Sequence, residues 1–157
     1  MKKFTAYFTL LILPFFFFST QLSAQKDDDF NFPPDFGKTA TTILIAPATK
    51  DKVTESFADA FEKEYKGLFE LTADAFPKSS KYKAAKYKYV FVAMEKENPA
   101  QTIGRDRFPA TTDYKFGLRD MLTGKTYYQD FWSGSYKKGA RNYVKHLEKL
   151  RKQNAGE

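Results

Sequence analysis

The chain has 157 residues, with 26 Lys and Arg against 19 Asp and Glu, one His and no Cys. This length is typical of a single domain. The absence of Cys excludes disulfide scaffolds, thiol nucleophiles and cysteine metal sites, as well as lipid attachment through an N-terminal Cys. One His excludes a metal site with two imidazoles and leaves a single base for Ser-His-Asp chemistry. We therefore predict no metal and no cofactor.

The N-terminus has the layout of a bacterial secretory signal. Lys2 and Lys3 are followed by a stretch, residues 4–18, that is almost wholly apolar, and small and polar residues then continue to Ala24. We predict a signal peptide over residues 1–24, cleaved near Ala24, and a periplasmic or secreted mature protein. The alternative is a membrane anchor, but an apolar run of about 15 residues is shorter than the roughly 20 that a spanning helix needs. The cleaved chain is therefore predicted to have no transmembrane span.

Export also limits the partners that a basic chain can meet. The net charge is +7, and the mature chain stays basic after cleavage because the leader removes only two cations, Lys2 and Lys3. Outside the inner membrane the available polyanions are cell-wall polymers, anionic glycans and lipid head groups, so we predict no nucleic acid partner. Aromatic residues make up 18% of the chain, which provides a core that needs no disulfide.

Residues 25–40 precede the predicted domain. A Pro-Pro pair and an acid triplet disfavour both helix and strand there, so we predict an extended N-terminal arm. Three phenylalanines are available to attach this arm to the domain: Phe30, Phe32 and Phe36. The single globular domain is expected over residues 41–152.

Two elements are predicted at the start of the domain. Residues 41–46 have consecutive apolar side chains, typical of a central strand that is buried on both faces. A helix is expected over residues 51–75, with Asp51 as its N-cap, although Gly67 weakens its last turns. Its apolar stripe, at steps of three and four residues, consists of Val53, Phe57, Phe61, Tyr65, Leu68 and Thr72.

The middle of the chain contains a basic linker over residues 77–88 and a second doubly apolar strand over residues 89–94. Residues 95–112 are polar and contain prolines and a glycine. We predict a long loop there, and a loop of that length in a compact domain is either functional or mobile.

The last third is predicted to form a hairpin and a helix. Residues 113–121 alternate between apolar and polar, Gly124 can adopt the positive φ of a turn, and residues 126–132 form the return strand. Ser133 or Ser135 can cap a final helix that ends near residue 152, and residues 153–157 are predicted to fray. The apolar stripe of this helix consists of Tyr136, Ala140, Tyr143, Leu147 and Leu150.

The predicted order is strand, helix, three strands, helix. We assign an α+β fold, or a small α/β variant, with a mixed sheet of about four strands packed by two amphipathic helices.

Catalytic chemistry finds little support, and we predict no catalytic residue. His146 has no Ser or Asp at a spacing typical of a triad. The alternative is a small envelope-glycan hydrolase that uses two carboxylates, because four acids lie at predicted strand ends. The distance between the two carboxylates defines such a hydrolase, and a sequence does not provide that distance. The four acids are Glu95, Asp113, Asp120 and Asp130.

The candidate binding residues lie in the basic linker and in the polar loop. Amines and tyrosine rings in the linker can bind an anionic glycan, and two arginines in the loop can bind a carboxylate or phosphate in a bidentate manner. The alternative is an ordinary solvated surface. The candidates are Lys81, Tyr82, Lys83, Lys86, Arg105 and Arg107.

The second half of the chain resembles a known envelope family. Residues 89–93 (YVFVA), the pattern Leu118, Asp120, Thr123, Gly124 and Lys125, and the final amphipathic helix are similar to the TolB N-terminal and CsgG-like type of domain, as is the opening stretch TILIAPAT. The resemblance implies a small mixed α/β domain that docks to other envelope proteins. We therefore predict a non-catalytic interaction domain that binds an envelope protein, an anionic glycan or a lipid head group.

Overall fold

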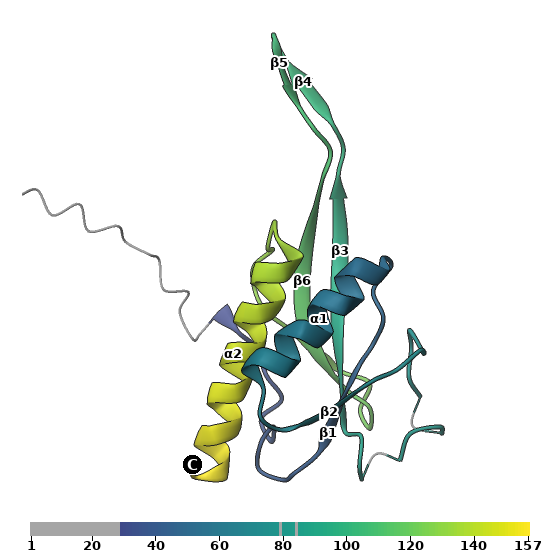
Figure 1. Cartoon of the computed structure of the whole chain (residues 1–157), viewed down its shortest axis with the longest axis vertical. Helices are drawn as coiled ribbons and strands as arrows, with labels where there is room; N and C mark the ends of the chain where they lie inside the picture. Colours follow the sequence, from purple (N-terminus) through teal and green to yellow (C-terminus); the bar gives the residue numbers. More distant parts are fainter. Residues whose placement is uncertain (1–28, 79, 84) are drawn as a thin grey trace, which may run out of the picture.

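The computed structural model describes residues 29–78, 80–83 and 85–157, so the predicted signal peptide over residues 1–24 lies outside the described residues. A five-stranded sheet has the order β2-β1-β3-β6-β7, formed in that order by Leu68–Leu71, Thr42–Ile45, Tyr89–Asn98, Thr111–Asp120 and Thr126–Tyr128 (Figure 1). A separate two-stranded sheet pairs β4 (Gln101–Ile103) with β5 (Asp106–Phe108). Strand β1 (Thr42–Ile45) runs parallel to both of its neighbours, β2 and β3. Strand β6 runs antiparallel to both of its own neighbours, β3 and β7. The sheet is therefore mixed, and the predicted α+β class is confirmed.

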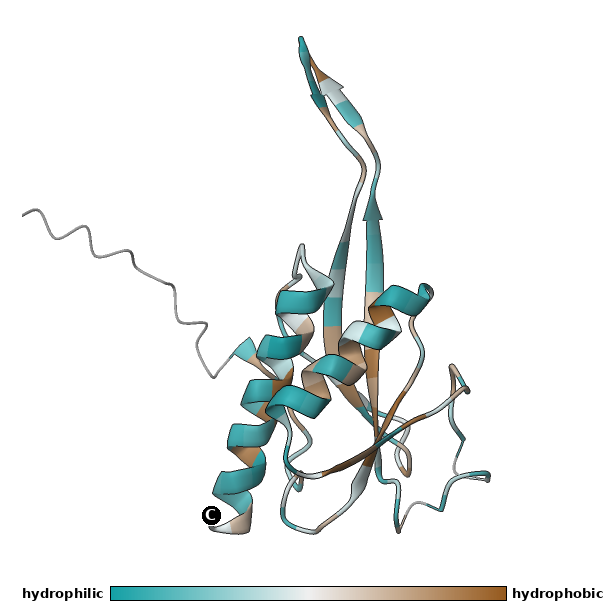
Figure 2. Cartoon of the chain, viewed as in Figure 1, coloured by the Kyte–Doolittle hydropathy of each residue, from teal (hydrophilic) through white to brown (hydrophobic). Residues whose placement is uncertain are grey.

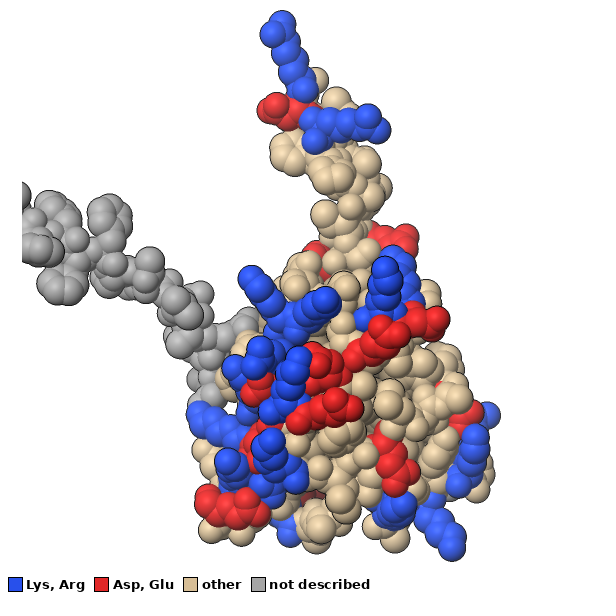
Figure 3. All heavy atoms as spheres, in the orientation of Figure 1, with Lys and Arg blue, Asp and Glu red and all other residues tan. Residues whose placement is uncertain are grey.

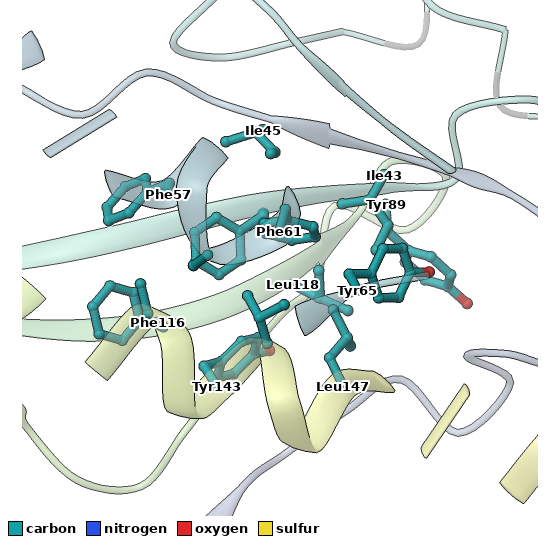
Figure 4. Close-up of a cluster of buried hydrophobic side chains, with 14 of the residues drawn as sticks. Ile43, Ile45, Phe57, Phe61, Tyr65, Tyr89, Phe116, Leu118, Tyr143 and Leu147 are labelled. Atoms are coloured by element: carbon teal, nitrogen blue, oxygen red, sulfur yellow. The ribbon is translucent and has the colours of Figure 1, made fainter. Parts of the chain in front are cut away.

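Both helices, α1 (Asp51–Glu64) and α2 (Tyr136–Ala155), cover the same face of the sheet (Figure 1). Their apolar stripes meet alternate side chains of the central strands, because only every second residue of a strand faces the helices. The resulting core is rich in aromatic rings (Figure 4). Phe57 meets Phe91 edge to face at 5.2 Å, and Phe91 lies 5.7 Å from the ring of Tyr143. Such pairs stabilise a core beyond their buried area alone.

The helix predicted over residues 51–75 is too long. It begins at Asp51, with Lys50 rather than Asp51 at the cap position, and it ends at Glu64. The chain then forms a strand, β2 (Leu68–Leu71), which pairs in parallel with β1. The helical spacing of three and four residues continues through Leu68, but this side chain is 65% exposed and contributes little to the core. Backbone pairing with β1 decides the structure here, because tertiary contacts override helical periodicity.

The opposite face of the sheet is covered by chain that connects β2 to β3 (Tyr89–Asn98). A small apolar cluster, formed around Leu44 and Val90, packs there against Tyr82 and Tyr87. The central strands are therefore buried on both faces, as their uninterrupted apolar sequence predicts.

The loop predicted over residues 95–112 is a β-hairpin. Strand β3 continues to Asn98 and pairs along its whole length with β6 (Thr111–Asp120), whose first residue lies opposite Asn98. Beyond that pair the hairpin continues as β4 (Gln101–Ile103) and β5 (Asp106–Phe108). We name residues 94–115 the hairpin arm. It projects well past both helices (Figure 1). Its polarity misled the prediction, because β4 and β5 are exposed on both faces and pack on no core.

The predicted turn after β6 is confirmed, since Gly124 has φ +72° and leads into β7 (Thr126–Tyr128). Ser135 caps α2 by accepting a hydrogen bond from the Lys138 amide. At Gly139 this helix comes very close to the sheet, and a Cβ atom there would lie 2.4 Å from Phe116 Cε2. Only glycine permits this approach without displacing the Phe116 ring.

The N-terminal segment also joins the core. Phe30 and Phe36 are buried, and Phe32 is partly buried with its ring stacked on Phe30 at 6.2 Å. Within the described residues, no helix is both long and apolar enough to span a membrane.

Candidate functional site

The predicted binding residues divide into two groups that lie at opposite ends of the molecule (Figure 1). Lys81, Tyr82 and Lys86 belong to the connection between β2 and β3, beside the lower half of the sheet, as does Lys83. Arg105 and Arg107 lie at the tip of the hairpin arm. The structure therefore does not combine the six residues into one surface.

Acids from the same region pair with two of the linker amines. Lys81 Nζ lies 2.7 Å from Asp74 Oδ2, and Lys86 Nζ lies 2.9 Å from Glu70 Oε1. The hydrogen bond to Asp74 raises the pKa of Lys81, and the hydrogen bond from Lys86 lowers the pKa of Glu70. These pairs are exposed, so each contributes little stability. They nevertheless reduce the positive charge that the linker offers to an anionic partner.

The tyrosines of the linker are part of its packing. Tyr82 and Tyr87 meet edge to face at 5.6 Å. The Tyr82 hydroxyl lies 2.6 Å from Thr72 Oγ1 and donates a hydrogen bond to Asp74, and the Tyr87 hydroxyl donates to Glu70. Of the four linker candidates, only Lys83 is exposed with no ion pair to another described residue. The linker thus resembles a structural network more than an open binding surface.

The tip of the hairpin arm has the opposite character. Arg105 and Arg107 are exposed, and no ion pair joins either of them to a carboxylate among the described residues. Figure 3 shows cationic side chains at this end of the molecule. Two large apolar side chains lie beside them: Ile103 is 63% exposed and Phe108 is 52% exposed. Figure 2 shows this apolar segment at the far end of a largely hydrophilic ribbon.

The register of the arm separates its apolar and basic side chains. Gln101 pairs with Phe108, and Ile103 pairs with Asp106. Paired residues share a face of the ribbon, and so do residues two apart on one strand. Ile103 and Phe108 therefore lie on one face of the arm, where Pro99 and Pro109 border a hollow of about 360 Å³. Arg107 lies on the other face.

Our sequence reasoning named the two arginines but missed Ile103 and Phe108. A signal was present, because Gly104 and Arg105 lie midway between two β-prone segments of equal length, the arrangement of a long hairpin around a two-residue turn. Gly104 has φ +62°, as such a turn requires.

The four strand-end acids do not form a pair of catalytic carboxylates. Asp120 accepts hydrogen bonds from the amides of Leu122 and Thr123 in its own turn, at 2.8 and 2.9 Å. Asp113 accepts a hydrogen bond from Asn98 Nδ2 at 2.9 Å. Asp113 and Asp120 are seven positions apart on β6, a distance of roughly 23 Å at the usual rise per residue, which is beyond the range of a glycosidase pair.

Glu95 and Asp130 complete this set. Glu95 lies opposite Tyr114 and Asp113 opposite Lys96, so these two neighbouring acids occupy opposite faces of the arm. Asp130 accepts a hydrogen bond from Asn31 Nδ2 at 2.7 Å. The geometry therefore gives the hydrolase alternative no support.

His146 has a packing role. Its ring stacks on Phe30 at 4.0 Å, and its Nδ1 atom lies 2.9 Å from the carbonyl oxygen of Asn142. No group of three or more acidic or imidazole side chains that could hold a metal ion occurs within residues 29–78, 80–83 and 85–157.

Comparisons with known proteins place few limits on this chain. No protein-family model matches it, and no curated protein does. Among solved structures it is similar to TolB from Acinetobacter baumannii, with 12% identity and a TM-score of 0.43. The match covers 69% of this chain but only 27% of that one, so the chain spans about a quarter of the length of TolB. This is a weak resemblance at the level of the fold.

Proposed function

We propose that this chain is an exported, non-catalytic interaction domain that docks on an envelope protein through the tip of its hairpin arm. One observation supports this most strongly: the arm extends away from the body and carries exposed apolar and cationic side chains at its end (Figures 1 and 2). The body supplies a rigid base, because β3 and β6 of the arm are also the central strands of the sheet.

The tip contributes nothing evident to the stability of the fold. A two-stranded ribbon is marginally stable by itself in water, and exposed apolar side chains such as Ile103 and Phe108 gain little from burial in the free protein. A partner that covers this face would bury both side chains. The arrangement therefore favours a role in recognition.

The chemistry of the tip indicates the type of partner. An aromatic and an aliphatic side chain share one face of the tip, and Arg107 lies on the other face. Aromatic residues and arginine are both enriched at protein interfaces. Arg105 and Arg107 form a bidentate pair best with a carboxylate. A protein surface with an apolar hollow bordered by Asp or Glu fits these properties better than a polymer without apolar groups.

Export supports an envelope location for this partner. The leader over residues 1–24 is expected to be removed near Ala24, which would release the domain into the periplasm or the medium. An anionic polymer, bound by the basic linker around Lys83 or by the tip arginines, is the competing partner class.

Site-specific photo-crosslinking in cells tests this proposal. A photoreactive phenylalanine analogue is placed at Phe108, and a matched control carries it at Leu122, which is 66% exposed in the turn at the other end of β6. We expect a discrete crosslinked envelope protein from position 108 and none from position 122. Addition of Arg105→Gln and Arg107→Gln should reduce the yield severalfold.

Two results would count against docking through the tip. Equal crosslinking from both positions would show unspecific contact. No crosslink from position 108, together with salt-sensitive sedimentation of the purified chain with peptidoglycan or an anionic glycan, would assign the polymer as the partner instead.

A further inference from the structure

A groove lies on the face of the sheet opposite the helices. It has a volume of about 540 Å³ and is bordered by the connection after β2 on one side and by the β6–β7 hairpin on the other. Its floor is apolar, since Val92 of β3 lies there beside Ala46, next to the fully buried Val90, and the exposed ring of Phe76 lies at its edge. This volume lies within the range of roughly 300 to 1,000 Å³ that is usual for small-ligand sites.

One cation lies in this groove. Arg119 is half-buried and shares the groove face with Val90 and Thr126, its register partners on β3 and β7. Its charge also acts on Tyr128: burial raises the pKa of the Tyr128 hydroxyl, and the nearby guanidinium opposes that rise. Arg119 and Tyr128 are therefore close neighbours on the same wall.

Arg119 has no carboxylate partner among the described residues, unlike two other arginines of the domain. Arg141 pairs with Glu64, and Arg151 pairs with Glu148, but no described carboxylate pairs with Arg119. Glu95 also borders the groove, yet its register partner is Tyr114, which packs in the core on the helix side. Because side chains alternate along a strand, the Glu95 carboxylate is directed to the other face of the sheet.

We propose that this groove binds a small amphipathic carboxylate, whose head pairs with the Arg119 guanidinium and whose apolar body lies over Val92 and Ala46. A half-buried cation above an apolar floor is costly without an anion, and a guanidinium binds a carboxylate through two parallel hydrogen bonds. The groove and the tip of the hairpin arm have no lining residue in common, since the groove extends along β3 only as far as Glu95, so this site is independent of docking through the tip.

Isothermal titration calorimetry with octanoate and octanol tests the site. The two molecules have the same apolar body, and only octanoate has a charged head. We expect octanoate to bind the mature chain roughly tenfold or more tightly than octanol, as a charge-assisted hydrogen bond predicts. Arg119→Gln should weaken octanoate to the affinity of octanol, and Arg119→Lys should retain part of the difference.

Two controls locate the binding. Arg107→Gln makes the same change of charge on the arm and should leave octanoate affinity unchanged. Val92→Phe fills the floor and should weaken octanoate and octanol together. Equal octanoate affinity in wild type and Arg119→Gln, or no octanoate binding to wild type, would overturn the proposal. If Arg119→Gln does not fold, the wild-type comparison decides: octanol binding as tightly as octanoate refutes the role of the charge.

Discussion

Replacement of Gly139 by Ala should destabilise the domain, although the same change stabilises most helices. Inside an exposed helix, Gly→Ala gains roughly 0.5–1 kcal/mol. In this structure the new Cβ would lie 2.4 Å from Phe116 Cε2 and 2.6 Å from Ser133 Oγ. Phe116 is fully buried against Phe57 and Phe91, so its ring has no free space into which to move.

The expected magnitude follows from these two opposing effects. Overpacking of a core costs typically about 1–3 kcal/mol, which exceeds the helical gain. We predict a net loss of about 0.5–2 kcal/mol in the free energy of unfolding, and hence a Tm lower by roughly 2–8 °C for a domain of this size. The assay is thermal unfolding followed by circular dichroism, repeated in urea to obtain the free energy directly.

Gly134 provides the matched control. A Cβ at Gly134 would meet its nearest atom, Asp113 Oδ1, at 3.6 Å, which is ordinary van der Waals contact. Gly134→Ala should therefore change the stability by no more than about 0.5 kcal/mol. A Gly139→Ala variant as stable as wild type, or more stable, would refute the close approach of α2 to β6.

Three further results are expected. Glu148 accepts hydrogen bonds from Arg151 and from the Lys66 amide. Burial raises the pKa of Glu148, but these bonds and the nearby cations outweigh burial, so the pKa lies below its ordinary value. Glu148→Gln should therefore cost about 1.5–3 kcal/mol at neutral pH. Because the pKa is lowered in the folded state, this stabilisation is present above the unfolded pKa of about 4.3 and is lost as the pH falls through the folded value. The free energies of unfolding of wild type and Glu148→Gln, measured in urea, should therefore converge in acid. A difference in free energy that stays constant with pH would contradict the assignment. Replacement of residues 97–112 by Asn-Gly joins the register partners Lys96 and Asp113 through a two-residue turn. The Tm should stay within a few degrees of wild type, because the removed residues pack on no core. A Tm much lower than that of wild type would show that the arm stabilises the fold. Mass spectrometry of the exported protein should find a chain that begins at or near Gln25, and an intact leader would contradict export by cleavage.

Periodicity predicts the parts of this fold that are buried on one side or on both. The stripe around Phe57 and the stripe around Tyr143 both face the core, and the doubly apolar strands are the central ones. Two elements were wrong because local pattern did not decide them. The end of α1 depends on pairing between Leu68–Leu71 and β1, and β4 and β5 have no buried face for periodicity to detect.

The candidate site was less accessible to sequence reasoning than the fold. Six basic and aromatic residues looked equivalent in the chain, but Lys81 and Lys86 have acidic partners that approach only in the folded state. Ile103 and Phe108 share a face only through the register of β4 with β5. The sequence pattern places Arg119 on the solvated face of a strand. Its groove exists only because the connection after β2 crosses the face of the sheet opposite the helices.

The role of the hairpin arm is tested most directly by sedimentation of the purified mature chain with isolated envelope fractions, in full-length and arm-shortened forms side by side. The arm-shortened form carries Asn-Gly in place of residues 97–112 and retains the groove and the linker. The account predicts that the full-length chain sediments with the envelopes while the arm-shortened chain stays in the supernatant, with equal Tm values for both. Equal sedimentation of the two forms would contradict it.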